Sequence, residues 1–366
     1  MKLVLYITLF ALVLGAAPSA RAAKYVLQNR QDSVIGEVLT VQSELKDTLL
    51  DIARKHGLGY EEIKLVNPEL DTWMPGKDKQ VKLPLKFILP KTPRQGIVLN
   101  IPEMRLYYYP DNGKEGIQEV ITYPLGVGRE GWSTPYMKTK IIEKKRNPKW
   151  YPPESIRQEH EEAGDPLPKV VEAGPDNPLG DHAMRLGQPE YLIHGTNKPY
   201  GVGMRVSHGC IRLYPEHIAD LFEQVNLGTP VEIVNQPYKI GELNGVLYLE
   251  AHPYLDEDAS VFENNLTPIV KLIVESTAEQ DYEIDWDLVR EVARNPTGVP
   301  TPIGVTRIER VIAATDINMD EELNATRSKP SETVETESII NEAMTTQQQK
   351  LELRLDNTIR PEKYYR

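Results

Sequence analysis

Alternating apolar and polar positions dominate the middle of the chain, between residues 96 and 235. Residues 96–101 and 104–109 alternate on either side of a Pro102-Glu103 step, a pattern typical of a β-hairpin. The same two-residue period predicts further strands at 120–125, 138–143, 191–193 and 230–234. This region is therefore predicted to form a mainly β domain.

Helical spacing of apolar residues predicts one helix close to the end of this domain. Pro215 opens a run in which Ile218, Leu221 and Phe222 recur at helical spacing, and Gly228 ends it. Before it, residues 147–189 are rich in proline, glycine and charge. A connection of this length is typical of a lid or a binding loop. A second amphipathic helix, at 286–293, is predicted in the region 237–305, where short strands alternate with Pro-Gly turns.

Residues 37–90 follow a different order: strand, helix, helix, strand. The first helix, at 49–56, has Thr48 as a plausible N-cap and Gly57 as its stop. The second, at 60–66, ends at Asn67-Pro68, and the strands are predicted at 38–41 and 81–84. This small α+β (βααβ) order resembles the LysM module, which binds glycan chains containing N-acetylglucosamine. The alternative is a generic α+β cap on the following domain.

The two ends of the chain predict export and a solvated tail. Lys2 precedes an apolar stretch at 3–17, and Ala20-Arg21-Ala22 supplies the small residues that a signal peptidase reads. The apolar stretch is shorter than the roughly 20 residues of a membrane span, so residues 1–22 are predicted to be a cleaved signal peptide. No later segment is apolar enough to span a membrane. Residues 306–366 are polar and acidic, and are predicted to be a disordered tail.

The charge and length narrow the class of protein. The chain has 366 residues, enough for two or three domains, and a net charge of −12. An acidic chain is a poor partner for nucleic acid or for an anionic membrane surface. We therefore expect a catalytic domain at 95–236 and an extension at 237–305, with neither nucleic acid nor a membrane span involved.

Cys210 is the only cysteine, so no disulfide within the chain explains it. It follows Ser207, His208 and Gly209, and His194 lies 16 residues upstream. This arrangement is typical of a cysteine nucleophile with a histidine base. A backbone carbonyl near Gly195 could orient His194, because no acidic residue is close to either motif in sequence. The N–H groups of Gly209 and Cys210, with His208, could stabilise an oxyanion.

Two arginines could bind a substrate carboxylate, namely Arg212 and Arg205. Tyr191 and Ser207 are further candidates for substrate contact. The remaining histidines are interpreted as surface or structural residues: His56, His160, His182, His217 and His252. Three alternatives for the motif stay open. Cys210 could simply be a buried packing residue, could hold zinc together with His194 and His208, or could be a redox thiol.

The two motifs, Ile193-His194-Gly195-Thr196-Asn197 and Ser207 to Leu213, resemble the signature of the L,D-transpeptidases, the YkuD or ErfK/YbiS/YcfS/YnhG family. The resemblance extends to residues 105–109, 148–153 and 174–180. It implies a β-sandwich or barrel catalytic domain and a cysteine acyltransferase of bacterial cell-wall synthesis that needs no cofactor and no metal. Cys210 would be the nucleophile and His194 the proton donor and acceptor. Gly195 would orient His194 through its carbonyl, and His208 and Gly209 would lie on the oxyanion side.

The resemblance also implies the substrates. Cys210 would attack the meso-diaminopimelate carbonyl of a tetrapeptide stem of peptidoglycan and release D-Ala. The acyl group would pass to another stem, giving a 3→3 cross-link, or to the terminal lysine of an outer-membrane lipoprotein. Alternatives are an L,D-carboxypeptidase, an amidase that releases lipoprotein, and a non-catalytic LysM-type scaffold. A periplasmic location, acylation by carbapenems and a periplasmic thiol reductase as a partner are also expected.

Overall fold

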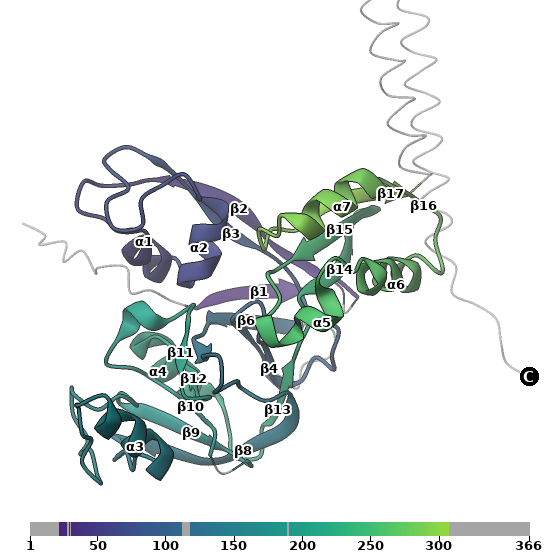
Figure 1. Cartoon of the computed structure of the whole chain (residues 1–366). Coiled ribbons are helices and arrows are strands. Elements are labelled where there is room, and N and C mark those ends of the chain that lie inside the picture. Colours follow the sequence, from purple (N-terminus) through teal and green to yellow (C-terminus); the bar gives the residue numbers. More distant parts are fainter. Residues whose placement is uncertain (1–21, 28, 30, 112–117, 189, 307–366) are drawn as a thin grey trace, which may run out of the picture. The chain divides into compact units, whose positions relative to one another are not determined.

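The computed structural model describes residues 22–27, 29, 31–111, 118–188 and 190–306 (Figure 1). The predicted signal peptide falls almost entirely on residues 1–21, and the predicted tail almost entirely on 307–366, so both lie outside the described residues. Within the described part of the chain, no helix is long and apolar enough to cross a membrane. All of the described residues belong to one compact unit, which ends at Arg307.

A large sheet carries the fold, and the described residues contribute nine strands to it (Figure 1). Their spatial order is β1, β6, β5, β4, β13, β8, β9, β10, β12. The pairs β4–β13 and β10–β12 are parallel, and the other neighbours are antiparallel. The bounds are β1 Ala23–Leu27, β4 Gly96–Asn100, β5 Arg105–Tyr109, β6 Gln118–Pro124, β8 Met137–Arg146, β9 His182–Leu186, β10 Leu192–His194, β12 Ile211–Arg212 and β13 Pro230–Val234.

The predicted mainly β character of this domain is confirmed, and so is the hairpin of β4 and β5. Every residue of β5 is buried, because the sheet is covered on both faces. Leu106 and Tyr108 belong to the core that contains α4 (Pro215–Gln224), the helix predicted from its apolar spacing. Tyr107 and Tyr109 belong to a second core on the other face. Successive residues of a strand point to opposite faces, so a single strand serves both cores.

The N-terminal module supplies the second core. It consists of β2 (Val34–Gln42), α1 (Leu49–Lys55), α2 (Tyr60–Val66) and β3 (Gln80–Ile88), in the predicted order. Thr48 and Asp51 form a reciprocal capping box at α1, which fixes the start of that helix. The module is an insertion, because β1 precedes it and pairs with β6 of the large sheet. Its identity as a LysM module stays a prediction.

A fully buried arginine joins this module to the sheet. Arg105 of β5 donates to both carboxylate oxygens of Glu62 on α2, at 2.7 and 2.8 Å. It also donates to Thr122 at 2.8 Å and to the Gly57 carbonyl at 3.1 Å, and it lies 4.2 Å from the centre of the Phe87 ring. A buried charge is tolerated only when it is paired and hydrogen-bonded, and Arg105 meets both conditions.

The composition of residues 147–189 predicted one long loop, and this prediction is wrong. The segment contains α3 (Glu154–Glu162) and the whole of β9, which pairs with β8 and β10. Ala183, Met184 and Leu186 of β9 are buried, but the strand is too short for its alternation to stand out against the surrounding prolines and glycines. Only Ile156 of α3 is buried, so this helix had no apolar face from which to predict it. Two short strands nearby, β7 (Val127–Gly128) and β11 (Arg205–Ser207), pair in parallel.

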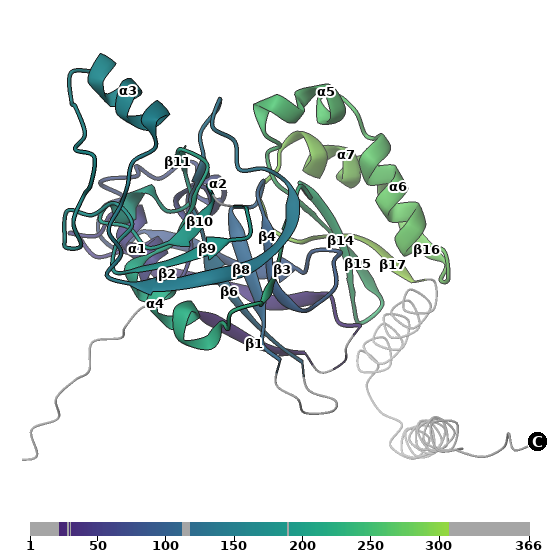
Figure 2. The same ribbon diagram turned by 90° about the horizontal axis from the view of Figure 1, so that it is seen from below.

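The extension after residue 237 has its own sheet and core. Its strands pair in the order β14, β15, β17, β16, with α6 against β14 and α7 against β15 (Figure 2). The predicted helix α7 is confirmed, whereas α6 was not predicted. The elements are β14 Tyr238–Leu243, β15 Val246–Ala251, a 3-10 turn η2 Asp256–Asp258, α5 Ala259–Phe262, α6 Thr267–Ser276, β16 Tyr282–Ile284, α7 Trp286–Arg294 and β17 Thr301–Thr306.

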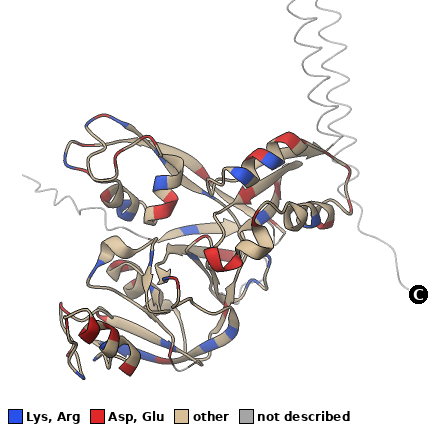
Figure 3. Ribbon diagram, in the orientation of Figure 1, with Lys and Arg blue, Asp and Glu red and all other residues tan. Residues whose placement is uncertain are grey.

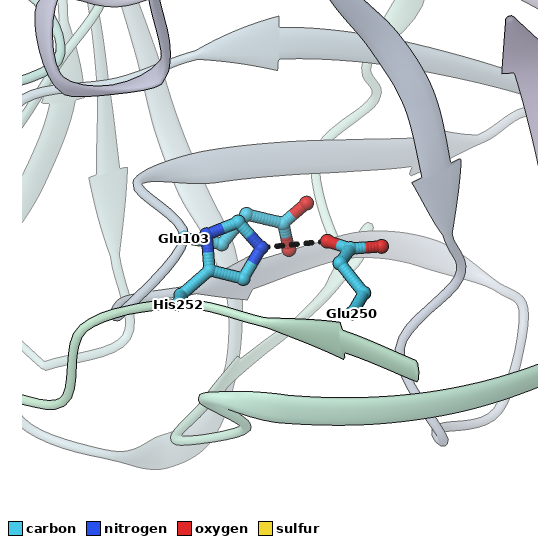
Figure 4. Close-up of side chains that lie close together, drawn as sticks. All are labelled: Glu103, Glu250 and His252. Carbon is cyan, nitrogen blue, oxygen red and sulfur yellow. Dashed lines mark hydrogen bonds and ion pairs between the residues drawn. The ribbon is translucent and has the colours of Figure 1, made fainter. Parts of the chain in front are cut away.

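A buried charge cluster joins the extension to the large sheet. Lys239 of β14 lies 2.8 Å from Glu103 and 2.7 Å from Glu250, and it donates to the Ile88 carbonyl at 2.6 Å. His252 lies 2.6 Å from Glu250, and Figure 4 shows its ring pointing at that carboxylate. The Lys239 ammonium therefore pairs with two carboxylates that come from different parts of the chain.

Replacing Lys239 by methionine is expected to lower the free energy of unfolding by about 3–5 kcal/mol, because it leaves two buried carboxylates without their cation. Urea denaturation of the full chain measures this. The control is Lys91→Met, which removes a lysine from an exposed pair with Glu275. The control is expected to leave the denaturation midpoint nearly unchanged. Equal effects of the two substitutions would contradict the assignment of Lys239 as the cation that holds the cluster together.

Candidate active site

A cavity of about 1420 Å³ contains the predicted nucleophile and base. Cys210, His194, His208 and Arg212 all line it, as does Ser207. Many of the other lining residues come from the segment 147–185, including Trp150, Tyr151 and residues of α3. The predicted lid segment thus borders the site, although much of it is regular structure.

Two adjacent parallel strands bring the motifs together. In the register of β10 and β12, Ile193 pairs with Ile211 and His194 pairs with Arg212. Ile193 and Ile211 are both buried in the core, which fixes the two strands. Because Cys210 immediately precedes Ile211, the same pairing brings the thiol to the strand that ends in His194. A separation of sixteen residues in sequence becomes proximity at one edge of the sheet.

His194 is buried and held by backbone carbonyl groups. Its Nδ1 lies 2.6 Å from the Gly195 carbonyl oxygen, the contact that the sequence had suggested. A second backbone hydrogen bond involves Leu179, from the segment before β9. Burial, and after it the positive charge of Arg212, lowers the pKa of His194 to about 3. The imidazole therefore favours its neutral form near pH 7.

The thiol is half-buried and also uncharged. Its Sγ lies 3.6 Å from the Glu190 carbonyl oxygen. Burial raises the pKa of Cys210, although the Leu192 N–H and the positive charges of Arg212 and Arg185 act in the opposite direction. Both pKa shifts thus favour the uncharged forms, a thiol on Cys210 and a neutral imidazole on His194.

The loop that carries the thiol is fixed by two hydroxyl groups. Ser207 donates to the Cys210 carbonyl at 2.6 Å, and Thr134 donates to the Gly209 carbonyl at 2.9 Å. Gly209 has a φ of 96°, and a Cβ there would lie 3.1 Å from the Tyr191 ring. Only glycine adopts this conformation without strain. Ser207 thus braces the loop from within and Tyr191 packs against it. Thr134, which also holds this loop, was not singled out by sequence analysis.

His208 faces the segment 147–185. Its Nε2 lies 3.1 Å from Glu159 of α3 and 3.2 Å from Arg129, and its ring packs edge-on against Trp132. Glu159 and Arg129 also form an ion pair with each other. Sequence analysis missed both residues. The acidic composition of α3, visible in Figure 3, was the only signal that pointed to Glu159.

The two candidate arginines separate in the structure. Arg212 lines the cavity, and its Nε is buried without a hydrogen-bond partner among the described residues. Arg205 instead pairs with Glu257 at 2.8 Å and donates to the Gly128 carbonyl at 3.2 Å. It is not part of the cavity lining. Arg205 thus has a protein carboxylate as its partner, and its role as a contact for a substrate carboxylate stays a prediction.

The residues proposed for zinc do not converge. His208 turns to Glu159, and His194 turns to the Gly195 carbonyl. Among the described residues, the one group of three with ligand geometry is Glu103, Glu250 and His252. Lys239 already contacts both of those carboxylates, so this group is an ion-pair cluster.

Comparison with known proteins places the chain in a family. The profile of the YkuD family, described as the L,D-transpeptidase catalytic domain, matches residues 94–233. The chain is 38% identical over 301 residues to the "Probable L,D-transpeptidase YbiS" of Escherichia coli K12, a match that covers 80% of this chain and 97% of that protein. It is 37% identical to "Probable L,D-transpeptidase YcfS" of the same strain, covering 80% and 92%.

A further relative and one solved structure complete the comparison. The chain is 35% identical to the "Probable L,D-transpeptidase ErfK/SrfK" of Salmonella typhimurium, covering 78% of this chain and 93% of that protein. The NMR structure of the catalytic domain of an E. faecium L,D-transpeptidase aligns with 21% identity and a TM-score of 0.29, covering 40% of this chain and all of that domain. The identity and coverage of the full-length relatives decide the assignment: this chain belongs to the L,D-transpeptidase family.

Proposed function

We propose that Cys210 is the nucleophile of this L,D-transpeptidase and that His194 is its proton donor and acceptor. The observation that carries the proposal is the β10–β12 pairing, which joins the two motifs at the edge of one cavity. The packing alternative for Cys210 is less well supported, because its thiol lines that cavity. A redox role lacks a second cysteine in the sequence.

The chemistry starts from the neutral pair. The thiol proton passes to His194 as sulfur attacks the carbonyl carbon of the donor, so that charge separates only during the reaction. The carbonyl oxygen becomes an oxyanion near the N–H groups of Gly209 and Cys210. When the intermediate collapses, the C–N bond breaks and the leaving amine takes the proton from His194. The Gly195 carbonyl supports the imidazolium through Nδ1, which it holds at 2.6 Å.

The second half-reaction uses the same groups in reverse. An incoming amine attacks the thioester, its proton passes to His194, and the thiol is regenerated. We infer that His208 and Gly209 lie on the oxyanion side, with His208 oriented by Glu159. Residues of the segment 147–185 cover part of the cavity and favour a peptide amine over water as the acceptor.

The donor is proposed to be a peptidoglycan tetrapeptide stem, attacked at the carbonyl of meso-diaminopimelate with release of D-Ala. Such a stem carries a free carboxylate close to the bond that breaks. Arg212 offers a guanidinium whose buried Nε has no partner among the described residues, beside both Cys210 and His194. Arg212 therefore remains the proposed carboxylate contact, and Tyr191 and Ser207 act on the loop.

The acceptor is proposed to be an amine of a second stem or of a lysine-ended outer-membrane lipoprotein. Release of lipoprotein and L,D-carboxypeptidase activity share the first half-reaction and remain alternatives. We propose a periplasmic location, supported by the signal-like pattern of residues 1–22. An oxidising compartment also makes a thiol reductase a reasonable partner for the lone cysteine.

The first test is covalent trapping. Incubation of the full chain with a disaccharide-tetrapeptide is expected to add the mass of the acyl fragment to Cys210, and a carbapenem is expected to add its own mass. Cys210→Ser should abolish both adducts, and His194→Gln should slow their formation by at least about a hundredfold, since general base catalysis supplies a factor of that order. Intact-mass spectrometry reads the result. Folded, reduced wild-type protein that forms no adduct would refute the nucleophile.

The protonation state of the Cys210 thiol can be tested by measuring its alkylation rate as a function of pH. Because burial raises the pKa of Cys210 and only the thiolate is alkylated, the iodoacetamide rate should keep rising above pH 9. The same residue in urea-unfolded protein is the control, and there the rate should level off above the ordinary cysteine pKa of about 8.5. A plateau below pH 8 in folded protein would mean a thiolate–imidazolium pair instead.

The role of Arg212 can be isolated with two donors. Arg212→Leu is expected to raise KM for a tetrapeptide about 10–100-fold, the range for a lost charge-assisted hydrogen bond. For the same tetrapeptide with an amidated C-terminal carboxylate, wild-type and variant should differ little. If KM rises by the same factor for both donors, Arg212 acts on the fold or the thiol and not on the carboxylate.

A further inference from the structure

The acidic turn η2 of the C-terminal extension contacts the loops beside Cys210. Figure 3 shows this turn as a group of acidic residues next to α5. Its Glu257 accepts a hydrogen bond from Ser133 and pairs with Arg205 of β11 at 2.8 Å. The Arg205 side chain is only 18% exposed and that of Glu257 32%. The ion pair is therefore partly shielded from solvent. Glu257 lies outside residues 94–233, which match the family's catalytic domain.

The two partners of Glu257, Arg205 and Ser133, are both connected to the Gly128 backbone. Arg205 donates through Nε to the Gly128 carbonyl at 3.2 Å, and Ser133 precedes Thr134 in sequence. The Gly128 N–H donates to the Thr134 hydroxyl at 3.1 Å. Glu257 therefore links β11, and through it β7, to the loop 129–136 that carries Thr134.

Thr134 passes this bracing to the thiol loop. It is 3% exposed, and its hydroxyl donates to the Gly209 carbonyl at 2.9 Å. In a trans peptide the C=O and N–H groups point in opposite directions. Holding the Gly209 carbonyl on Thr134 therefore directs the Cys210 N–H away from Thr134. Glycine at φ 96° has more conformational freedom than other residues, so this peptide needs an external hold to keep one orientation.

The charge of Glu257 is available for this role. Burial raises the pKa of its carboxyl, but the hydrogen bonds from Ser133, from its own backbone and from Arg205 together bring the pKa below its usual value. The turn also has anchors that do not involve Glu257, because Asp258 accepts from Tyr136 of the same loop and from Asn235, each at 2.9 Å. Asp256, on the same turn, makes no side-chain contact of this kind in the described part of the chain.

We propose that Glu257 is a positioning residue for acyl transfer: through Arg205, Ser133 and Thr134 it fixes the Gly209–Cys210 peptide so that the Cys210 N–H can receive the oxyanion. The C-terminal extension is then part of the catalytic device and not an appended domain. This inference rests on the proposed function, since it concerns the oxyanion of the Cys210 reaction.

The test separates two reactions of the same thiol. Acylation by a tetrapeptide donor passes through an oxyanion, whereas alkylation by iodoacetamide is a direct displacement at carbon and does not. Glu257→Ala in the full chain is expected to lower the acylation rate and kcat about tenfold, a part of the roughly 10²–10³ attributed to one oxyanion donor. KM should stay within about twofold, and the alkylation rate should not change.

Matched variants on the same path and the same turn complete the test. Asp256→Ala removes a neighbouring charge from the turn and is expected to behave as wild type in both reactions. Glu257→Gln keeps an acceptor oxygen and should recover part of the lost kcat. Thr134→Val should lower the acylation rate further than Glu257→Ala does, and it should also leave the alkylation rate unchanged. The double variant should be no worse than Thr134→Val alone, because both act through one contact.

Several outcomes would overturn the inference. If Glu257→Ala matches Asp256→Ala, the turn has no influence on the reaction. If acylation and alkylation fall together, the substitution disturbs the thiol site as a whole. If Glu257→Ala and Thr134→Val add independently, they do not share a path. Failure of the proposed function is read separately, since Cys210→Ser would then keep its acyl-transfer activity.

Discussion

Burial of charge is the constraint on which this structure depends. Arg105 is completely removed from solvent, and Lys239 and its two carboxylates are nearly so. A buried cation without partners costs several kcal/mol, so each of these side chains requires its partners to be in place. In each case one partner comes from another part of the chain: Arg105 of the large sheet pairs with Glu62 of the N-terminal module, and Lys239 of the extension pairs with Glu103, which lies between β4 and β5. Both segments are thereby tied to the sheet that carries the thiol.

Around the proposed nucleophile and base, burial opposes charge. Burial favours the neutral forms of both Cys210 and His194, and only backbone groups and Ser207 hydrogen-bond around them. A neutral thiol is a weaker target for oxidation than a thiolate. Under the proposed mechanism, charge separates only when a donor is bound.

Sequence alone was informative wherever chemistry and structure are local. The helices at 49–55, 60–66 and 215–224 follow from caps, stops and apolar spacing, and the hairpin follows from alternation around Pro102. The pairing of Cys210 with His194 followed from residue types that have little other reason to occur together. The contact between His194 Nδ1 and the Gly195 carbonyl was also foreseen, because no acidic residue lay near enough in sequence to orient the ring.

Contacts between residues far apart in the sequence could not be predicted. Arg205 looked available for a substrate because its partner, Glu257, lies 52 residues later in the sequence, in the turn η2. Glu159 and Thr134 carry no motif, and their importance comes from the loops that folding brings beside them.

The position of β1 has a consequence for how the protein is made. Ala23 pairs with Thr122, so β1 can pair only with a strand about a hundred residues later in the sequence. The whole inserted module can fold before this pairing forms, while the edge of β1 remains unpaired. Sheet closure is then a late, non-local event, which slows folding and exposes a strand to mispairing. Chaperone dependence during biogenesis would be concentrated in this interval.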